Sequence, residues 1–329
     1  MPVFWYELSV TAPPETVEAI SELMGRFVQG GVSIEEPYRL LDDGQAHETI
    51  ADAPVTVRVY VPADADGEEA RTRIEEGLWH LRQIGAGEQI AIGQLATRKL
   101  AEEDWANAWK DYYHPLKLGR RVVIRPSWRD YTPKKDEVVV ELDPGMAFGT
   151  GLHPTTRNCV LLLEETVKPG DRVLDVGSGS GILTLAALKL GASSVLALDV
   201  SSVAVEATRE NAAINGFGRQ VEAQLATLEG AAGEPYFPLP PNVRVLGAEV
   251  GTYDLVLANI IARVIAQLAP ALVRAVRPGG SLIASGIIAE RRDEALEPLR
   301  AAGLSNIREV VEGDWITLVG VRASESSLP

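Results

Sequence analysis

The sequence predicts a two-domain α/β protein, in which a smaller ferredoxin-like α+β domain precedes a doubly wound, mostly parallel sheet of seven strands. Three observations lead to this prediction. The chain has 329 residues, which exceeds the usual size of one domain. Its first third shows two strand–helix–strand patterns, and from residue 171 onward short apolar strands alternate with longer helices. We expect domains at 1–97 and 119–329, joined by a helical linker at 98–118.

The N-terminal elements follow from alternating apolar residues and from residues that start or end helices. Strands are expected at 3–10, 32–36, 55–62 and 89–95, and helices at 13–29 and 68–84, with turn residues from Pro37 onward. Asp64 and Asp66 precede the second helix as start signals, and Gly85 follows it as a stop signal. The order β-α-β-β-α-β is the one that a ferredoxin-like sandwich requires.

Negative charge is concentrated in the same third of the chain. The formal net charge is −15, and residues 1–95 hold six Arg and no Lys against 17 Asp plus Glu, a formal charge of −11. Such a surface repels nucleic-acid phosphates and attracts a basic partner, although it would equally serve solubility alone. We therefore expect no direct reading of nucleic acid.

Composition also bears on compartment and on metals. No apolar run approaches the length of a membrane span, and no basic-then-apolar leader opens the chain. The single cysteine, Cys159, cannot form an internal disulfide, and the four histidines are too far apart for a local metal motif. A cytoplasmic protein without membrane contact and without a metal site is expected.

The linker carries an aromatic stripe. Trp105, Trp109 and Tyr112 stand at i, i+4 and i+7, which places them on one face of a helix. A stripe with this spacing is more typical of packing between elements than of a ligand box. Two further strands are expected at 121–126 and 137–142.

The C-terminal part alternates between strands and helices, and ligands of such sheets bind at the carboxyl ends of the strands. Strands are expected at 172–176, 194–198, 220–224, 253–258, 281–286, 307–312 and 315–321, and helices at 181–190, 202–215, 260–277 and 289–302. Residues 226–250, rich in Gly, Pro and Ala, indicate an inserted loop. Only Gly313 and Asp314 separate the last two strands, which predicts an antiparallel edge hairpin, usual in methyltransferase sheets and unusual in dinucleotide dehydrogenases.

A glycine-rich loop, residues 175–181, ends the first of these strands. A dinucleotide-binding loop needs Gly or Ala three positions after its second glycine, but Ile182 and Thr184 stand there in the two possible registers. The pattern Gly-x-Gly-x-Gly preceded by Asp is instead typical of S-adenosylmethionine sites, so we expect this cofactor, with its amino-carboxyl end over the loop. The candidate cofactor-binding residues of the loop are Asp175, Gly177, Ser178, Gly179 and Gly181.

Two polar residues end the second and the fourth of these strands. Asp199 follows Gly177 by 22 residues and can accept hydrogen bonds from both ribose hydroxyls; the alternative is that it caps the next helix together with Ser201 and Ser202. Asn259 ends the fourth strand, where its amide oxygen could orient an incoming amine, making it the candidate catalytic residue; an Asn in this place can also be a helix cap.

A loop rich in Gly, Thr and Pro, residues 143–156, precedes the first strand of the sheet. It is either a lid over the cofactor, through Phe148, Gly149, Thr150 and Gly151, or a connection in which Thr155 or Thr156 caps a helix. His153 is a candidate general base, with a structural role in the loop as the alternative.

These motifs together resemble the bacterial ribosomal protein L11 methyltransferases, the PrmA family. The resemblance covers nearly the whole chain from Glu102 onward, and the N-terminal domain agrees with the family's acidic ferredoxin-like domain. Its most specific part is the run Phe-Gly-Thr-Gly-x-His-Pro-Thr-Thr at 148–156, which general methyltransferases lack. The other matching runs are 102–105, 114–115, 126–129, 142–151, 175–183 and 258–260.

The resemblance implies S-adenosylmethionine binding through Thr156, Gly177, Asp199 and Asn259, a hinge at the aromatic helix, and recognition of L11 by the N-terminal domain. It implies methylation, up to trimethylation, of lysine ε-amines and of the N-terminal α-amine of L11, free or on the large ribosomal subunit. Ser178 stands where the family often has Cys, and 226–250 is longer than expected.

Three other functions stay open on the sequence. The first is a lysine methyltransferase with another target, such as electron-transfer flavoprotein, which the N-terminal domain disfavours. The second is a module that binds the cofactor without catalysis, of which the intact motifs give no sign. The third is a nucleic-acid methyltransferase, which the acidic first domain and the absence of Asn-Pro-Pro-aromatic at residue 259 disfavour.

Overall fold

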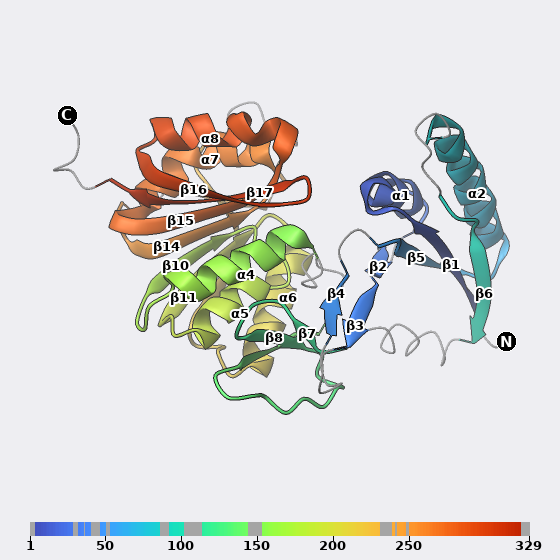
Figure 1. Ribbon diagram of the computed structural model, residues 1–329, viewed down its shortest axis with the longest axis horizontal. Coiled ribbons are helices and arrows are strands. Elements are labelled where there is room, and N and C mark those ends of the chain that lie inside the picture. The colour runs from blue at the N-terminus through green and yellow to red at the C-terminus, as the bar shows by residue number, and fades with distance from the viewer. Residues whose placement is uncertain are drawn as a thin grey trace. The chain divides into compact units, whose positions relative to one another are not determined.

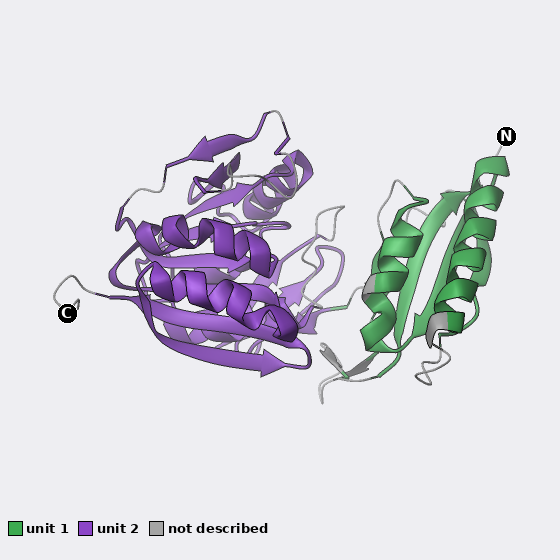
Figure 2. Ribbon diagram, turned by 90° about the horizontal axis from the view of Figure 1, so that it is seen from above, with its two compact units in different colours: residues 1–114 green, residues 115–329 purple. Residues whose placement is uncertain are grey.

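The computed structural model describes residues 4–28, 32–35, 37–40, 47–50, 53–85, 92–101, 114–143, 153–230, 239–240, 242–247 and 250–323. The chain divides into two compact units, Met1–His114 and Pro115–Pro329, drawn in different colours in Figure 2. The expected aromatic stripe, at 105–112, lies outside the described residues. Within the described ranges, no helix combines the length and the apolarity that a membrane span requires.

Unit 1 is a four-stranded antiparallel sheet with two helices. Its strands are ordered β2-β5-β1-β6, so the central pair is β1 with β5. Helices α1 and α2 lie on one face of the sheet (Figure 2). The sheet and its helices comprise β1 (Phe4–Ala12), η1 (Pro14–Thr16), α1 (Val17–Gly25), β2 (Ser33–Glu35), β5 (Val55–Pro62), α2 (Ala65–Gly85) and β6 (Ala96–Ala101).

The core of unit 1 forms because alternate strand residues face the helices. Val57, Val59 and Val61 of β5 are each at most 2% exposed and pack with Ile20 of α1 and Ile74 of α2. The opposite face of the sheet carries charge: Arg58 lies 2.6 Å from Glu7, and both side chains are buried. Burying this pair out of water is tolerated because each ion has a partner.

The sequence prediction for unit 1 needs two corrections. The fourth strand of the sheet is β6 at Ala96–Ala101, whereas a strand was expected at 89–95. The expected turn region after Pro37 contains a short hairpin, β3 (Tyr38–Leu40) paired with β4 (His47–Thr49). The other strands and helices of this unit overlap their expected positions.

Unit 2 is built on an eight-stranded sheet in the order β13-β12-β11-β10-β14-β15-β17-β16. Neighbours from β13 to β15 are parallel, whereas the edge strand pairs β15–β17 and β17–β16 are antiparallel. This confirms the mostly parallel α/β sheet with its edge hairpin. The strands are β10 (Arg172–Val176), β11 (Ser194–Asp199), β12 (Val221–Leu228), β13 (Arg244–Leu246), β14 (Tyr253–Asn259), β15 (Val276–Ile288), β16 (Leu304–Glu312) and β17 (Trp315–Arg322).

Two predictions for this sheet are wrong in part. The stretch 226–250 is not wholly a loop, because β12 continues to Leu228 and β13 adds an eighth strand at the edge. The helix expected at 260–277 ends at Ala275, and β15 begins at Val276 rather than at 281, so Pro278, Gly279 and Gly280 lie within the strand. A Cβ at Gly280 would stand 2.8 Å from the carbonyl oxygen of Asp254, so this close approach requires glycine.

Helices cover both faces of the sheet (Figure 1). Helices α7 and α8 pack on one face, and α4 and α5 pack on the other, where α6 also contributes. The helices are α4 (Pro154–Thr166), α5 (Ile182–Lys189), α6 (Ser202–Ile214), α7 (Ala262–Ala275) and, after η3 (Ala289–Arg291), α8 (Arg292–Ala301).

A small group of strands precedes α4. β7 (Leu116–Lys117) pairs antiparallel with β8 (Val122–Arg125), which pairs in parallel with β9 (Val138–Glu141). Their apolar side chains join the core on the α4 and α5 side of the sheet. The strands expected at 121–126 and 137–142 are thereby confirmed.

Candidate functional site

Three of the predicted site residues end neighbouring strands at the same level of the sheet. In the register, Val176 of β10 pairs with Leu198 of β11 on one side and with Ala258 of β14 on the other. The residues that follow are Gly177, Asp199 and Asn259. The strands run in parallel, so these three residues share the carboxyl edge, where α/β sheets bind their ligands.

The glycine loop adopts backbone conformations that favour glycine. Gly177, Gly179 and Gly181 have φ values of 81°, 55° and 82°, in the left-handed region. A Cβ at Gly177 would stand 2.4 Å from Cγ2 of Ile260, and one at Gly181 would stand 3.2 Å from Cα of Thr208. All three positions favour glycine because of their backbone torsion angles, and Gly177 and Gly181 also lack room for a Cβ.

The Asp199 carboxylate joins the glycine loop to the next strand. Its Oδ2 accepts from the backbone N–H of Gly179 at 2.9 Å, and its Oδ1 accepts from the N–H of Ser201 at 2.9 Å. Each carboxylate oxygen can accept more than one hydrogen bond, so both keep capacity for hydroxyl donors. Of the three residues in the capping alternative, Ser201 is the N-cap of α6, and Asp199 accepts from the N–H of this cap residue.

Asp175 lies beneath the loop rather than on it. Its side chain is 1% exposed, and its Oδ2 accepts from Oγ1 of Thr184 at 2.6 Å. Its Oδ1 is buried with no hydrogen-bond partner among the described residues. Burial, with a smaller contribution from the negative charge of Asp199, raises the pKa of Asp175 to about 6.

Side chains of α6 hold the loop from behind, and the sequence interpretation missed them. Thr208 Oγ1 donates to the carbonyl oxygen of Gly179 at 3.0 Å and lies 3.1 Å from Oγ of Ser178. Asn211 Nδ2 donates to the carbonyl oxygen of Ser180 at 2.9 Å. Thr208 and Asn211 are both buried, and their i, i+3 spacing on an otherwise apolar helix face was the available signal.

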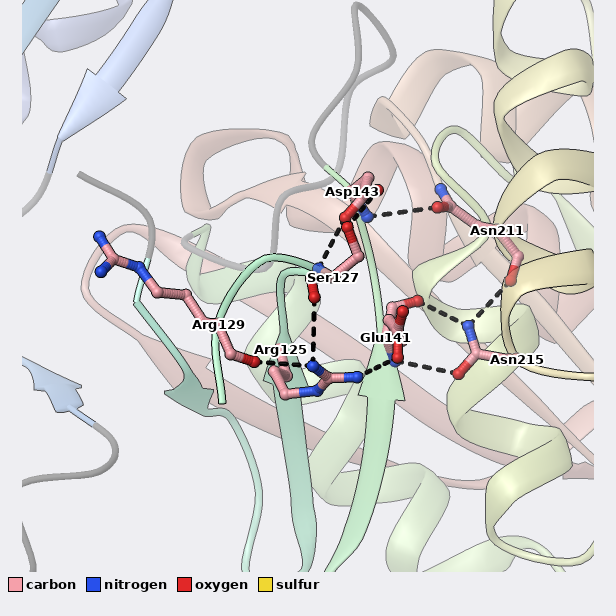
Figure 3. A network of polar contacts seen from close by, with 7 residues as sticks. All are labelled: Arg125, Ser127, Arg129, Glu141, Asp143, Asn211 and Asn215. Atoms are coloured by element: carbon pink, nitrogen blue, oxygen red, sulfur yellow. Dashed lines mark hydrogen bonds and ion pairs between the residues drawn. The ribbon is translucent and has the colours of Figure 1, made fainter. Parts of the chain in front are cut away.

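The same helix face also holds the end of β9 (Figure 3). Asn211 Oδ1 accepts from the backbone N–H of Asp143 at 3.3 Å. Asn215 brackets the backbone of Glu141, accepting from its N–H at 2.9 Å and donating to its carbonyl oxygen at 2.6 Å. Asp143 in turn accepts from the N–H and hydroxyl of Ser127, both at 2.8 Å. One helix thus positions both the glycine loop and the chain that leads to residues 144–152.

Helix α4 brings Thr156 to the third strand end. Thr156 is 1% exposed, and its Oγ1 lies 3.5 Å from Nδ2 of Asn259, a long contact. His153 is the N-cap of this helix: its Nδ1 accepts from the N–H of Thr155 at 3.3 Å and lies 2.7 Å from the Thr155 hydroxyl. Neither Thr155 nor Thr156 is the cap.

The environment of His153 favours its structural role over that of a general base. Burial lowers the pKa of the imidazole to about 4, so the ring is neutral at neutral pH. The Nδ1 lone pair is engaged with Thr155, within the first turn of α4. The predicted lid residues Phe148, Gly149, Thr150 and Gly151 lie outside the described residues.

Comparison with known proteins gives a family match over residues 4–323, to the family described as "Ribosomal protein L11 methyltransferase (PrmA)". A ribosomal protein L11 methyltransferase of Chloroflexus aurantiacus is 45% identical over 327 residues, covering 96% of this chain and 97% of that protein. One of Herpetosiphon aurantiacus is 44% identical over 322 residues, covering 95% and 97%. The crystal structure of a ribosomal protein L11 methylase from Lactobacillus delbrueckii subsp. bulgaricus matches with 34% identity and a TM-score of 0.51, covering 64% of this chain and 100% of that one.

Proposed function

This chain belongs to the ribosomal protein L11 methyltransferase (PrmA) family, and we propose that it transfers methyl groups from S-adenosylmethionine to ribosomal protein L11. The family match covers both units, including the N-terminal one that a methyltransferase with another target would not need. A protein such as electron-transfer flavoprotein is therefore the weaker candidate substrate. The expected site of action is the cytoplasm.

The observation that supports the cofactor site most strongly is the common level of Gly177, Asp199 and Asn259 at the carboxyl edge of the parallel sheet. In the proposed site the glycine loop, with Ser178 and Asp175, lies under the amino-carboxyl end of the cofactor. The Asp199 carboxylate accepts from the ribose hydroxyls, which an oxygen pair on a rigid strand end can do. Thr156 and the loop 148–151 complete the binding surface.

Asn259 is the proposed positioning group for the substrate amine. The bound cofactor supplies a methyl group on a sulfonium that is already activated, so the protein mainly has to hold the amine nitrogen in line with the methyl carbon. The amide oxygen of Asn259 can accept from an amine N–H and thereby direct its lone pair. A lysine amine with a reference pKa of about 10.4 must first lose its proton, which a water-poor site favours.

Unit 1 is the proposed substrate-recognition domain. Its strand order β2-β5-β1-β6 and its two helices on one face support a ferredoxin-like fold. Its acidity, −11 over residues 1–95, suits attraction to a basic protein. In this proposal 1–97 recognises L11, 98–118 is a hinge linker, and 119–329 carries the chemistry. The modified groups are lysine ε-amines and the N-terminal α-amine, with up to three methyl groups each, on L11 that is free or bound to the large subunit.

The test is methyl transfer from isotope-labelled S-adenosylmethionine to purified L11, followed by mass spectrometry of intact and digested product. Mass gains in methyl steps on lysines or the N-terminus, lost in an Asp199→Ala variant that still folds, would support the proposal. Cofactor binding without any transfer to L11 would reject the substrate and leave the cofactor site standing.

A further inference from the structure

The hairpin β16–β17 forms one side of the sheet, and its turn lies at the carboxyl edge, where the candidate site is also found. Asn259 of β14 pairs with Ser285 of β15, and β15 continues past this level to pair Ile288 with Trp315, the first residue of β17. The start of β17 is therefore at the carboxyl edge. The hairpin supplies none of the residues proposed to contact the cofactor.

Trp315 of β17 contacts the start of α4 directly, and Thr317 is linked to the first turn of α4 through Ser285 of β15. The ring of Trp315 meets the ring of His153 edge-on, with centroids 4.5 Å apart and planes at 74°. Thr317, two residues on and so on the same face of the strand, lies 2.6 Å from Oγ of Ser285, which donates to the carbonyl oxygen of Thr155 at 3.4 Å. Ser285 and Thr317 are fully buried.

Ion pairs between α4 and β16 continue the same contact along the helix. Arg157 lies 3.3 Å from Glu312, the residue that pairs with Trp315 across the hairpin. About two turns further, Glu165 of α4 lies 2.6 Å from Arg308. These partly exposed pairs contribute little energy each, but they fix which turn of α4 lies on the hairpin.

The contact with Trp315 is made to the residue that starts the helix. His153 caps α4 through Nδ1, and this requires a ring nitrogen without a proton. Burial lowers the pKa of His153 to about 4, and the ring of Trp315 is one of the groups that cover it. One turn along α4 from this cap, Arg157 forms an ion pair with Glu312 of the hairpin.

We propose that Trp315 is a positioning residue of the methyl-transfer site: it seats the His153 cap and so sets the first turn of α4, which presents Thr156 to Asn259. The inference rests on the proposed function, because it assigns Thr156 and Asn259 to the cofactor and amine site. It gives the hairpin a role at the site without any contact to cofactor or substrate.

The first experiment compares S-adenosylmethionine affinity by calorimetry in full-length Trp315→Leu, Trp315→Phe and Val311→Ala. Val311, on the same hairpin, is 62% exposed and serves as the matched control. Trp315→Leu is expected to bind the cofactor about two- to tenfold more weakly, the effect of losing an aromatic pair, while Phe restores most of the affinity. Equal affinity in Trp315→Leu and Val311→Ala, with both folded by thermal melting, would overturn the proposal.

The second experiment is a double-mutant cycle with Thr156→Val. If Trp315 acts through the first turn of α4, Trp315→Leu will weaken binding much less in the Thr156→Val background than in the wild type. Additive effects would mean that Trp315 acts elsewhere, and would reject the role assigned to it.

If Trp315→Leu does not fold, the proposal is tested instead by substitutions of the cap residue His153. His153→Asn keeps a side-chain oxygen that can cap the helix, and His153→Ala does not. Affinity retained in Asn and lost in Ala supports the positioning role, while equal losses reject it. These binding measurements need no L11, so a wild-type enzyme that binds cofactor without methylating L11 would reject only the proposed function.

Discussion

At the scale of single residues, Asp199 is the side chain proposed to hold the ribose of the cofactor. Asp199→Asn is expected to weaken S-adenosylmethionine binding by about ten- to a hundredfold, since a hydrogen bond to a charged acceptor contributes about 1.5–3 kcal/mol. Calorimetry measures this. The matched control is Glu206→Gln, the same change at an exposed position of α6. An unchanged affinity in Asp199→Asn would remove Asp199 from the ribose site.

The raised pKa of Asp175, about 6 instead of 3.8, makes the free energy of unfolding depend on pH. Between these values the folded protein holds a proton that the unfolded chain has released, so the contribution of Asp175 to stability falls as pH rises through this window. The shift corresponds to roughly 3 kcal/mol. Asp175→Asn has no such proton. The free energy of unfolding of this variant minus that of wild type should therefore increase by up to this amount between pH 4 and pH 7.

Denaturant unfolding at several pH values checks the Asp175 prediction. The exposed Asp130→Asn is the control, and its difference from wild type should stay flat over the same range. A difference between Asp175→Asn and wild type that does not change with pH would contradict a buried, partly protonated carboxyl at residue 175.

At the scale of elements, α6 supports the glycine loop from behind. Removing one of its buried side chains should therefore disturb the proposed cofactor site, although that side chain is not proposed to contact the cofactor. Asn211→Ala leaves the carbonyl oxygen of Ser180 and the N–H of Asp143 without this partner. A buried polar group left unsatisfied costs about 1–3 kcal/mol, so both the melting temperature and the cofactor affinity should fall. Glu210→Ala, on the exposed side of the same helix, should change neither. A loss of stability with full affinity would show that the loop holds its shape without the Asn211 side chain.

Elements with a local signal were predictable, and those without one were not. The glycine loop and the ends of β10, β11 and β14 follow from buried apolar runs that stop at polar or glycine residues, so their neighbours in sequence suffice. Strand β6 is an edge strand whose first four residues are exposed, so no alternation marks it. β13 is a mostly exposed edge strand of three residues in a stretch rich in Gly, Pro and Ala, so no alternation marks it either.

Some features of the site depend on contacts between distant segments, so a local pattern is at most a hint of them. Thr208 and Asn211 are polar residues in a helix, where exposure is the usual expectation, and only the packing of α6 against the loop makes them buried donors. The contact between His153 and Trp315 joins residues 162 positions apart across α4 and the hairpin. A pattern along the chain cannot show such a pair.

For the whole molecule, the uneven charge leads to a prediction about ionic strength. The net charge is −15, and −11 of it lies in residues 1–95, the proposed recognition domain. If a basic substrate is attracted by this field, the KM for L11 should rise as salt is added, because the screening length falls from about 10 Å at 0.1 M to about 3 Å at 1 M.

The matched readout is the affinity for S-adenosylmethionine, which should change little, since that site lies in unit 2 and its contacts are short-ranged. Replacing two of the exposed carboxylates of α2, Glu75→Gln with Glu76→Gln, should raise the KM for L11 at low salt and flatten its dependence on salt, with kcat unchanged. A KM that ignores salt in the wild type would mean that shape rather than charge guides recognition, and that the acidity of this domain serves solubility. A KM that depends on salt equally in both proteins would place the attracting charge elsewhere on the chain.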